Sequence, residues 1–132
     1  MCLVHDMGEA IVGDITPHCG VSEDDKYTKE KKAMTDISEM ASIAGPEWKE
    51  LWEEYETAAT PEARVVKQLD KFDMIAQAFE YEQRYEVDLE QFFASTTRAF
   101  SSEPFLQWNN DLRARRAKWI EEGRKITGKA VP

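Results

Sequence analysis

The chain has 132 residues, which is enough for one domain with a hydrophobic core and hardly enough for two. Its formal net charge of -9 disfavours a nucleic-acid polymer as a partner, whereas a mononucleotide is compatible with this charge if a bound metal reverses the local field. Cys2 and Cys19 lack the close spacing of a disulfide framework, and neither a signal peptide nor a membrane-spanning run is visible. We therefore expect an intracellular, cytoplasmic protein without a membrane partner.

The spacing of apolar residues is helical nearly throughout, which predicts an all-α bundle that forms a single domain over residues 1–132. Gly13 is expected to stop the first helix, Ser22 to cap the second, and Thr60 with Pro61 to start a long fourth helix. Gly45 and Pro46 are expected to end the second helix. The expected helices cover residues 1–12, Ser22 to beyond Ile43, a stretch around Trp48 to Tyr55, and residues 61–85 and 89–100. A last helix is expected within residues 104–126, and a loop that contains Pro17 at residues 13–21.

The run HDMGEAIVGDI at residues 5–15 concentrates metal-binding residue types. On a helix, Cys2, His5, Asp6 and Glu9 have the i, i+3, i+4, i+7 spacing, so an imidazole and two carboxylates share one face. Asp14 adds a third carboxylate directly after Gly13. Like charges in a partly buried helix need a counter-ion, and burial is predicted by the apolar residues Leu3, Val4, Met7, Ala10 and Ile11. The run therefore predicts a cation site, and the alternative is a surface His-Asp pair with a solvated Glu9.

Asp70 lies at the edge of the apolar stripe of the long fourth helix. An acid at such a position is costly unless it is paired or binds a cation. The alternative interpretation is a salt bridge to Lys67 or Arg64, and Asp73 is a rival candidate for the same role.

Two stretches that are dense in charge, residues 23–32 and 113–118, are predicted to be solvated helix faces. The aromatic residues lie at helical spacings, and we expect core or dimer contacts from Trp48, Trp52, Phe79, Phe92 and Phe93.

The chain resembles the HD-domain metal-dependent phosphohydrolases, and within them the 5′-deoxynucleotidase branch. The resemblance rests on HDMGEAIVGDITP at 5–17, KEKKAM at 29–34, LWEEYE at 51–56 and VKQLDKFDMIAQAFEYE at 66–82. It implies an HD-domain helical bundle in which His5 and Asp6 are the dyad ligands of a metal and Asp70 completes the site. It also implies that Glu9 and Asp14 orient or deprotonate the attacking water, and that in some members they hold a second cation with the main-chain carbonyl of Ile15.

The family pattern begins with a further histidine on a preceding helix, and this chain starts four residues before His5. We therefore expect a domain that is truncated at its N-terminus, with weak metal binding and poor activity when isolated. His18 is expected to be an exposed loop residue, and a role as substitute ligand would require its loop to fold back over the site.

The function that this resemblance implies is removal of the 5′-phosphate from deoxyribonucleoside monophosphates, and we expect a homodimer that uses a divalent cation. A mixed nitrogen and oxygen donor set suits Mn, Co, Fe, Zn or Mg. Lys67 is expected either to contact the phosphate or to pair with Asp70. The alternative is a non-catalytic helical interaction module, or a truncated isoform, with an incomplete metal site.

Overall fold

The computed structural model describes residues 1–16 and 18–123, and these residues form helices and no strand. The all-α class is therefore confirmed, and every helix in the described ranges is too short or too polar to cross a lipid bilayer. The chain divides into two compact units, Met1–Val66 and Lys67–Pro132. A single domain over the whole chain stays a prediction.

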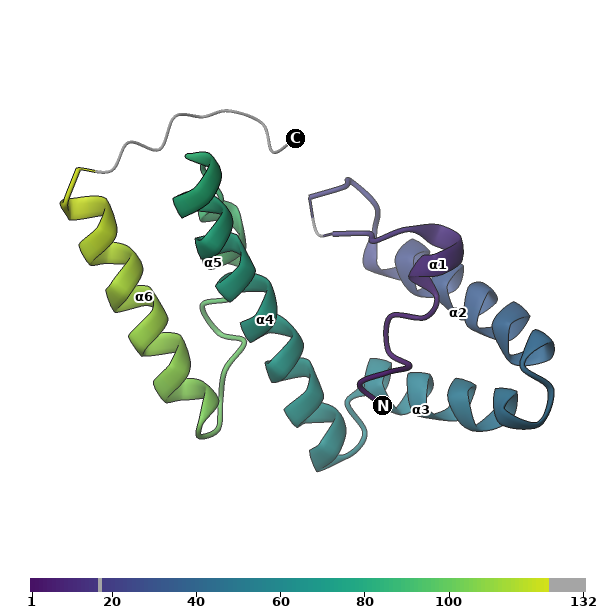
Figure 1. Ribbon diagram of the computed structural model, residues 1–132. Helices are drawn as coiled ribbons and strands as arrows, with labels where there is room; N and C mark the ends of the chain where they lie inside the picture. Colours follow the sequence, from purple (N-terminus) through teal and green to yellow (C-terminus); the bar gives the residue numbers. More distant parts are fainter. Residues whose placement is uncertain (17, 124–132) are drawn as a thin grey trace. The chain divides into compact units, whose positions relative to one another are not determined.

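The first unit is a helical hairpin with a short helix packed on it (Figure 1). It contains α1 (Glu9–Val12), α2 (Glu23–Met40), the 3₁₀ helix η1 (Ser42–Ala44), α3 (Gly45–Thr57) and the first residues of α4 (Pro61–Tyr85). Val4, Met34 and Trp52 form its buried cluster, and the cluster is surrounded by the partly buried Met7, Tyr27, Ile37, Trp48 and Leu51. Val4 therefore anchors the segment before α1 to residues of both hairpin helices.

Three predicted helix ends are confirmed by their capping contacts. The Ser22 hydroxyl accepts a hydrogen bond from the Asp25 N–H at 3.1 Å, and the Thr60 hydroxyl accepts one from the Ala63 N–H at 3.2 Å. Gly13 adopts a φ of 76°, and its N–H donates to the Glu9 carbonyl at 2.8 Å.

The predicted first helix is wrong over most of its length, because residues 2–8 form turns and the α-helix is confined to Glu9–Val12. Hydrogen bonds to the third preceding residue hold these turns, such as Val4 N–H to Met1 O and Glu9 N–H to Asp6 O. Leu3 is 91% exposed and Ile11 52% exposed, so these two members of the apolar set lie at the surface. Val4 is the one member of this set that is buried, and the turns direct its side chain toward the hairpin.

The second helix ends at Met40, earlier than predicted, and Gly45 begins α3. Ser42, the first residue of η1, has a φ of 54°, so the backbone leaves the α-helical path directly after α2. A Cβ atom on Gly45 would lie 1.8 Å from the Ser38 carbonyl oxygen, so the start of α3 passes directly against the backbone of α2. Glycine is therefore required at this position for space, because its φ of -56° is open to any residue.

We expect Gly45→Ala to destabilise the protein by about 3 kcal/mol, because the methyl group would overlap a backbone atom that no side-chain motion relieves. Urea unfolding followed by circular dichroism measures the change. Gly8→Ala is the matched control, since a Cβ there would meet the Glu30 carbonyl oxygen at an ordinary 3.5 Å. Equal stability of the two variants would contradict this account of the hairpin.

The second unit packs the remainder of α4, α5 (Glu90–Ser95) and α6 (Phe105–Glu121) around an aromatic core. The core consists of Ile75, Ala78, Phe79, Phe93, Phe100, Phe105, Leu112 and Trp119, which confirms the expected core roles of Phe79 and Phe93. The α5 helix is shorter than the predicted 89–100. The α6 helix lies within the range 104–126 in which the last helix was expected. Residues 124–126 of that range and the loop residue Pro17 lie outside the described residues.

Arg116 corrects the prediction that residues 113–118 are only a solvated face. It is 8% exposed, and its guanidinium donates to both carboxylate oxygens of Glu82, at 2.6 and 2.8 Å, and to Glu90 at 2.6 Å. It also lies over the Phe93 ring, at 4.0 Å from the centroid. Glu82 is fully buried, and a bidentate pair with arginine is the arrangement that compensates such a charge.

Candidate metal centre

The orientation of the His5 imidazole is set by a backbone carbonyl in its own turn. The Nδ1 atom lies 2.8 Å from the Cys2 carbonyl oxygen. A carbonyl can only accept a hydrogen bond, so Nδ1 carries the hydrogen and donates it. In the neutral ring this leaves the lone pair on Nε2, which is the form in which histidine binds metals when its other nitrogen is hydrogen-bonded.

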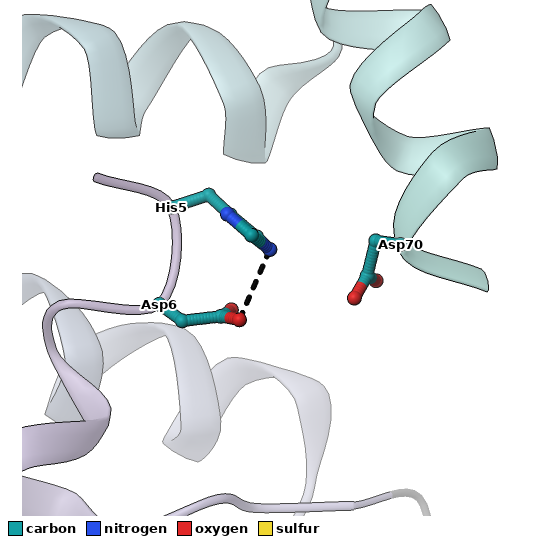
Figure 2. A group of neighbouring side chains, drawn as sticks. All are labelled: His5, Asp6 and Asp70. Atoms are coloured by element: carbon teal, nitrogen blue, oxygen red, sulfur yellow. Dashed lines mark ion pairs between the residues drawn. The ribbon is translucent and has the colours of Figure 1, made fainter. Parts of the chain in front are cut away.

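His5 and Asp6 present their polar atoms to each other. The His5 Nε2 and Asp6 Oδ2 atoms are 3.0 Å apart, and the dashed line in Figure 2 marks this pair. The His5 side chain is 14% exposed and the Asp6 side chain 56% exposed. The imidazole is therefore largely buried, and the carboxylate lies at the surface of the first unit. A nitrogen and a carboxylate oxygen at this separation hold either a proton or a cation between them.

Glu9, at the start of α1, lies in a negative field. Burial, followed by the carboxylates of Asp6, Asp14 and Glu30, raises the pKa of Glu9 from 4.5 to about 7, and only the Lys26 ammonium opposes this rise. A carboxyl group that titrates near neutral pH can take up or release a proton under physiological conditions.

Glu30 is a member of this acidic group that the sequence analysis missed. It lies on α2 and is 6% exposed, so the prediction of a solvated face over residues 23–32 is wrong at this position. Burial raises the pKa of its carboxyl above the ordinary value of 4.5, and Lys26, whose Nζ is 3.5 Å from Glu30 Oε1, counteracts the effect. Its position between Tyr27 and Met34, three and four residues away, was the available signal.

The loop after α1 holds the other residues predicted in the run at 5–15. Asp14 is exposed but contributes to the field at Glu9, and Ile15 is 9% exposed. His18 is exposed, as expected for a loop residue.

Asp70 lies on α4, in the second unit, and Figure 2 draws it with His5 and Asp6. Its side chain is 28% exposed, and its Oδ2 is 3.2 Å from the Nζ of Lys71, a partner that the sequence analysis did not consider. Lys67 is half-buried one turn earlier on the same helix, and the rival Asp73 is exposed. Asp70 is therefore more buried than its rival Asp73, and Lys71 lies within ion-pair distance of it.

The HD domain family matches residues 1–107, a range that contains His5, Asp6, Glu9, Asp14 and Asp70. The chain therefore belongs to the HD domain family. Membership of this family implies dependence on a divalent metal cation.

Relatives within this family have names that state an activity. The chain is 52% identical over 99 residues to the 5′-deoxynucleotidase hdd1 of Schizosaccharomyces pombe, an alignment that covers 70% of this chain and 50% of the relative. It is 44% identical over 106 residues to the 5′-deoxynucleotidase HDDC2 of Dictyostelium discoideum, with 76% and 56% covered. For the 5′-deoxynucleotidase HDDC2 of Homo sapiens the identity is 41% over 120 residues, with 89% and 59% covered. The chain thus spans between half and two thirds of the length of these relatives.

We expect the metal-free protein to lose stability as the pH rises from about 4.5 through 7, because the folded state binds the Glu9 proton more tightly than the unfolded state does. Glu9→Gln mimics the neutral acid, so it should raise the free energy of unfolding at pH 8 by on the order of 1 kcal/mol and change it little at pH 4. Urea titrations in the presence of EDTA at both pH values measure this difference.

Glu50→Gln, an exposed acid on α3, serves as the control and should show no such pH-dependent gain. A stabilisation by Glu9→Gln that is equal at pH 4 and pH 8 would contradict the predicted titration of Glu9.

Proposed function

We propose that this chain carries the catalytic part of a 5′-deoxynucleotidase, which removes the 5′-phosphate from deoxyribonucleoside monophosphates with a divalent cation. The observation that carries the proposal is the similarity, at 41–52% identity, to relatives from three organisms that are named 5′-deoxynucleotidases. The residues in which a phosphohydrolase site is expected all lie within the range matched by the HD domain family.

The proposed ligands of the first ion are His5, Asp6 and Asp70. Each offers one ligand atom, an imidazole nitrogen or a carboxylate oxygen, and this donor set suits Mn, Co, Fe, Zn or Mg. Two ligand atoms bound at a right angle, each about 2.1 Å from one cation, lie about 3.0 Å apart. The 3.0 Å separation of His5 Nε2 and Asp6 Oδ2 therefore supports a shared cation, and the contact of His5 Nδ1 with the Cys2 carbonyl supports Nε2 as the ligand atom.

A divalent cation held by these residues supplies Lewis acidity toward the phosphate and toward water. In the proposed reaction Glu9 accepts the proton of the attacking water, and its pKa of about 7 supports this role. Asp14 positions that water or the sugar hydroxyl. In the two-ion form of the proposal, Glu9, Asp14 and the carbonyl of Ile15 hold a second cation.

Lys67 is the proposed contact for the substrate phosphate, and an ion pair with Asp70 is the alternative role. We further propose a homodimer, since exposed apolar side chains such as Leu3 and Ile43, at 91% and 97% exposure, favour association. A cytoplasmic location belongs to the same proposal and is supported by the two free cysteines.

Phosphate release from a nucleotide panel tests the substrate class. We expect 5′-deoxyribonucleotides to be hydrolysed at least about tenfold faster than ribonucleoside 5′-monophosphates, deoxyribonucleoside 3′-monophosphates and cyclic nucleotides. Slow hydrolysis of all substrates is consistent with this expectation, provided that 5′-deoxyribonucleotides are hydrolysed fastest. An order led by another phosphate ester would contradict the substrate, and metal binding without release from any nucleotide would favour a non-catalytic module.

Metal content and turnover separate the roles of Asp70 and Glu9. We expect Asp70→Ala to lose the metal on dialysis, because a first-ion ligand is removed. Glu9→Ala should keep the first ion and lose on the order of 10²- to 10⁴-fold in turnover. Metal analysis by plasma mass spectrometry and phosphate release measure the two effects.

Asp73→Ala is the matched control, since it removes an exposed carboxylate three residues further along α4 and should change neither quantity. Equal metal loss in the Asp70 and Glu9 variants would indicate a shared two-metal site in place of this division. Metal loss in the Asp73 variant alone would move the ligand from Asp70 to Asp73.

A further inference from the structure

We propose that Tyr55 is a positioning residue for the metal centre: its ring confines the His5 imidazole in the orientation that directs Nε2 toward the cation. This inference rests on the proposed function, because it assigns a role to Tyr55 within the proposed metal site. Tyr55 touches the imidazole and is not proposed as a ligand.

The contact between the two rings has a defined geometry. The centroids of His5 and Tyr55 are 4.8 Å apart, and the ring planes meet at 61°, which is an edge-to-face arrangement. Tyr55 is 7% exposed and lies on α3, so its ring is held by the packing of the hairpin. The buried ring of Tyr55 is held rigidly by its helix, whereas His5 lies in a segment of turns, which restrain a side chain less.

The segment of turns at residues 2–8 packs against α3 through two consecutive residues, Val4 and His5, and their partners on α3 lie one helical turn apart. Val4 belongs to the buried cluster that contains Trp52, and His5 packs against Tyr55. Residues three apart share one face of a helix, so one face of α3 receives both residues. The backbone of the segment and the ring of His5 are thus fixed by the same element.

The hydrogen bond to the Cys2 carbonyl does not by itself fix the orientation of the His5 imidazole relative to the rest of the fold. The Nδ1 contact with the Cys2 carbonyl selects the tautomer, but both partners lie in the same short run of turns. Metal-binding histidines are oriented by a partner on the second ring nitrogen, and loss of such support typically lowers metal affinity 10- to 100-fold. Tyr55 supplies a restraint from outside the turn, because it limits rotation of the imidazole away from the carbonyl.

Histidine NMR is the direct test, because the chain has two histidines and the exposed His18 serves as an internal reference. In the wild type and in Tyr55→Phe, we expect the nitrogen shifts of His5 to report a hydrogen on Nδ1, and we expect zinc to perturb Nε2. In Tyr55→Leu, His5 should sample both tautomers, and the zinc affinity measured by titration calorimetry should fall about tenfold.

Tyr27→Leu is the matched control for a general loss of packing. Tyr27 lies in the same unit and stacks on Trp52, with centroids 5.6 Å apart, so its removal also deletes an aromatic ring from the hairpin. It should lower stability while changing the His5 tautomer and the zinc affinity much less than Tyr55→Leu does, because the ring that contacts the imidazole is retained. Equal loss of zinc affinity in the Tyr27 and Tyr55 variants would overturn the proposal, because it would reduce Tyr55 to a packing residue.

A measurement on the wild type covers the case in which Tyr55→Leu does not fold. Nuclear Overhauser contacts between the rings of His5 and Tyr55 should persist when zinc is added, and their loss on zinc binding would overturn the proposal. An unchanged tautomer and zinc affinity in a folded Tyr55→Leu protein would do the same. Absence of zinc binding by wild-type His5 would instead contradict the proposed metal site, so the two failures are distinguishable.

Discussion

The packing of the segment that precedes α1 against the α2–α3 hairpin is the interaction on which the candidate site in the first unit depends. Val4 is buried in a cluster with Met34 of α2 and Trp52 of α3, whereas the neighbouring Leu3 is 91% exposed. Burying one side chain of this size contributes about 1.5–3 kcal/mol, and here that contribution fixes the turns that carry His5 and Asp6. The hairpin in turn requires the close backbone approach at Gly45. The position of the imidazole is therefore set by packing several residues away from its polar atoms.

The same unit concentrates negative charge next to the imidazole. Asp6, Asp14 and Glu30 all act on the carboxyl of Glu9, and Lys26 is the cation that offsets part of their effect. Such an arrangement opposes folding in the absence of a counter-ion and favours a divalent cation in its presence, so metal binding and stability are thermodynamically linked. This linkage makes the acidic group useful to a metal centre even though it is unfavourable to the metal-free fold.

The sequence was informative where a local rule decides the structure. Ser22, Thr60 and Gly13 mark helix ends because capping depends on one side chain or one glycine. It was misleading where tertiary contacts decide. A helical periodicity over residues 1–12 does not reveal that only Val4 is buried, and the charge runs concealed Glu30 and Arg116, whose burial depends on partners elsewhere in the chain. The helical spacing of Glu30 from Tyr27 and Met34 places it on the apolar face of α2, whereas the many charged residues around it suggest a solvated face.

The candidate site shows the same division between local chemistry and distant packing. The type and spacing of His5, Asp6, Glu9 and Asp14 are visible in the sequence because ligand chemistry restricts which residues can serve. Tyr55 is invisible to such reasoning, since its contact with His5 joins residues fifty positions apart and any large apolar ring would satisfy the helical pattern of α3. The identity of a positioning residue is determined by the space that the fold leaves around its neighbour, whereas the identity of a ligand is determined by the coordination chemistry of the ion.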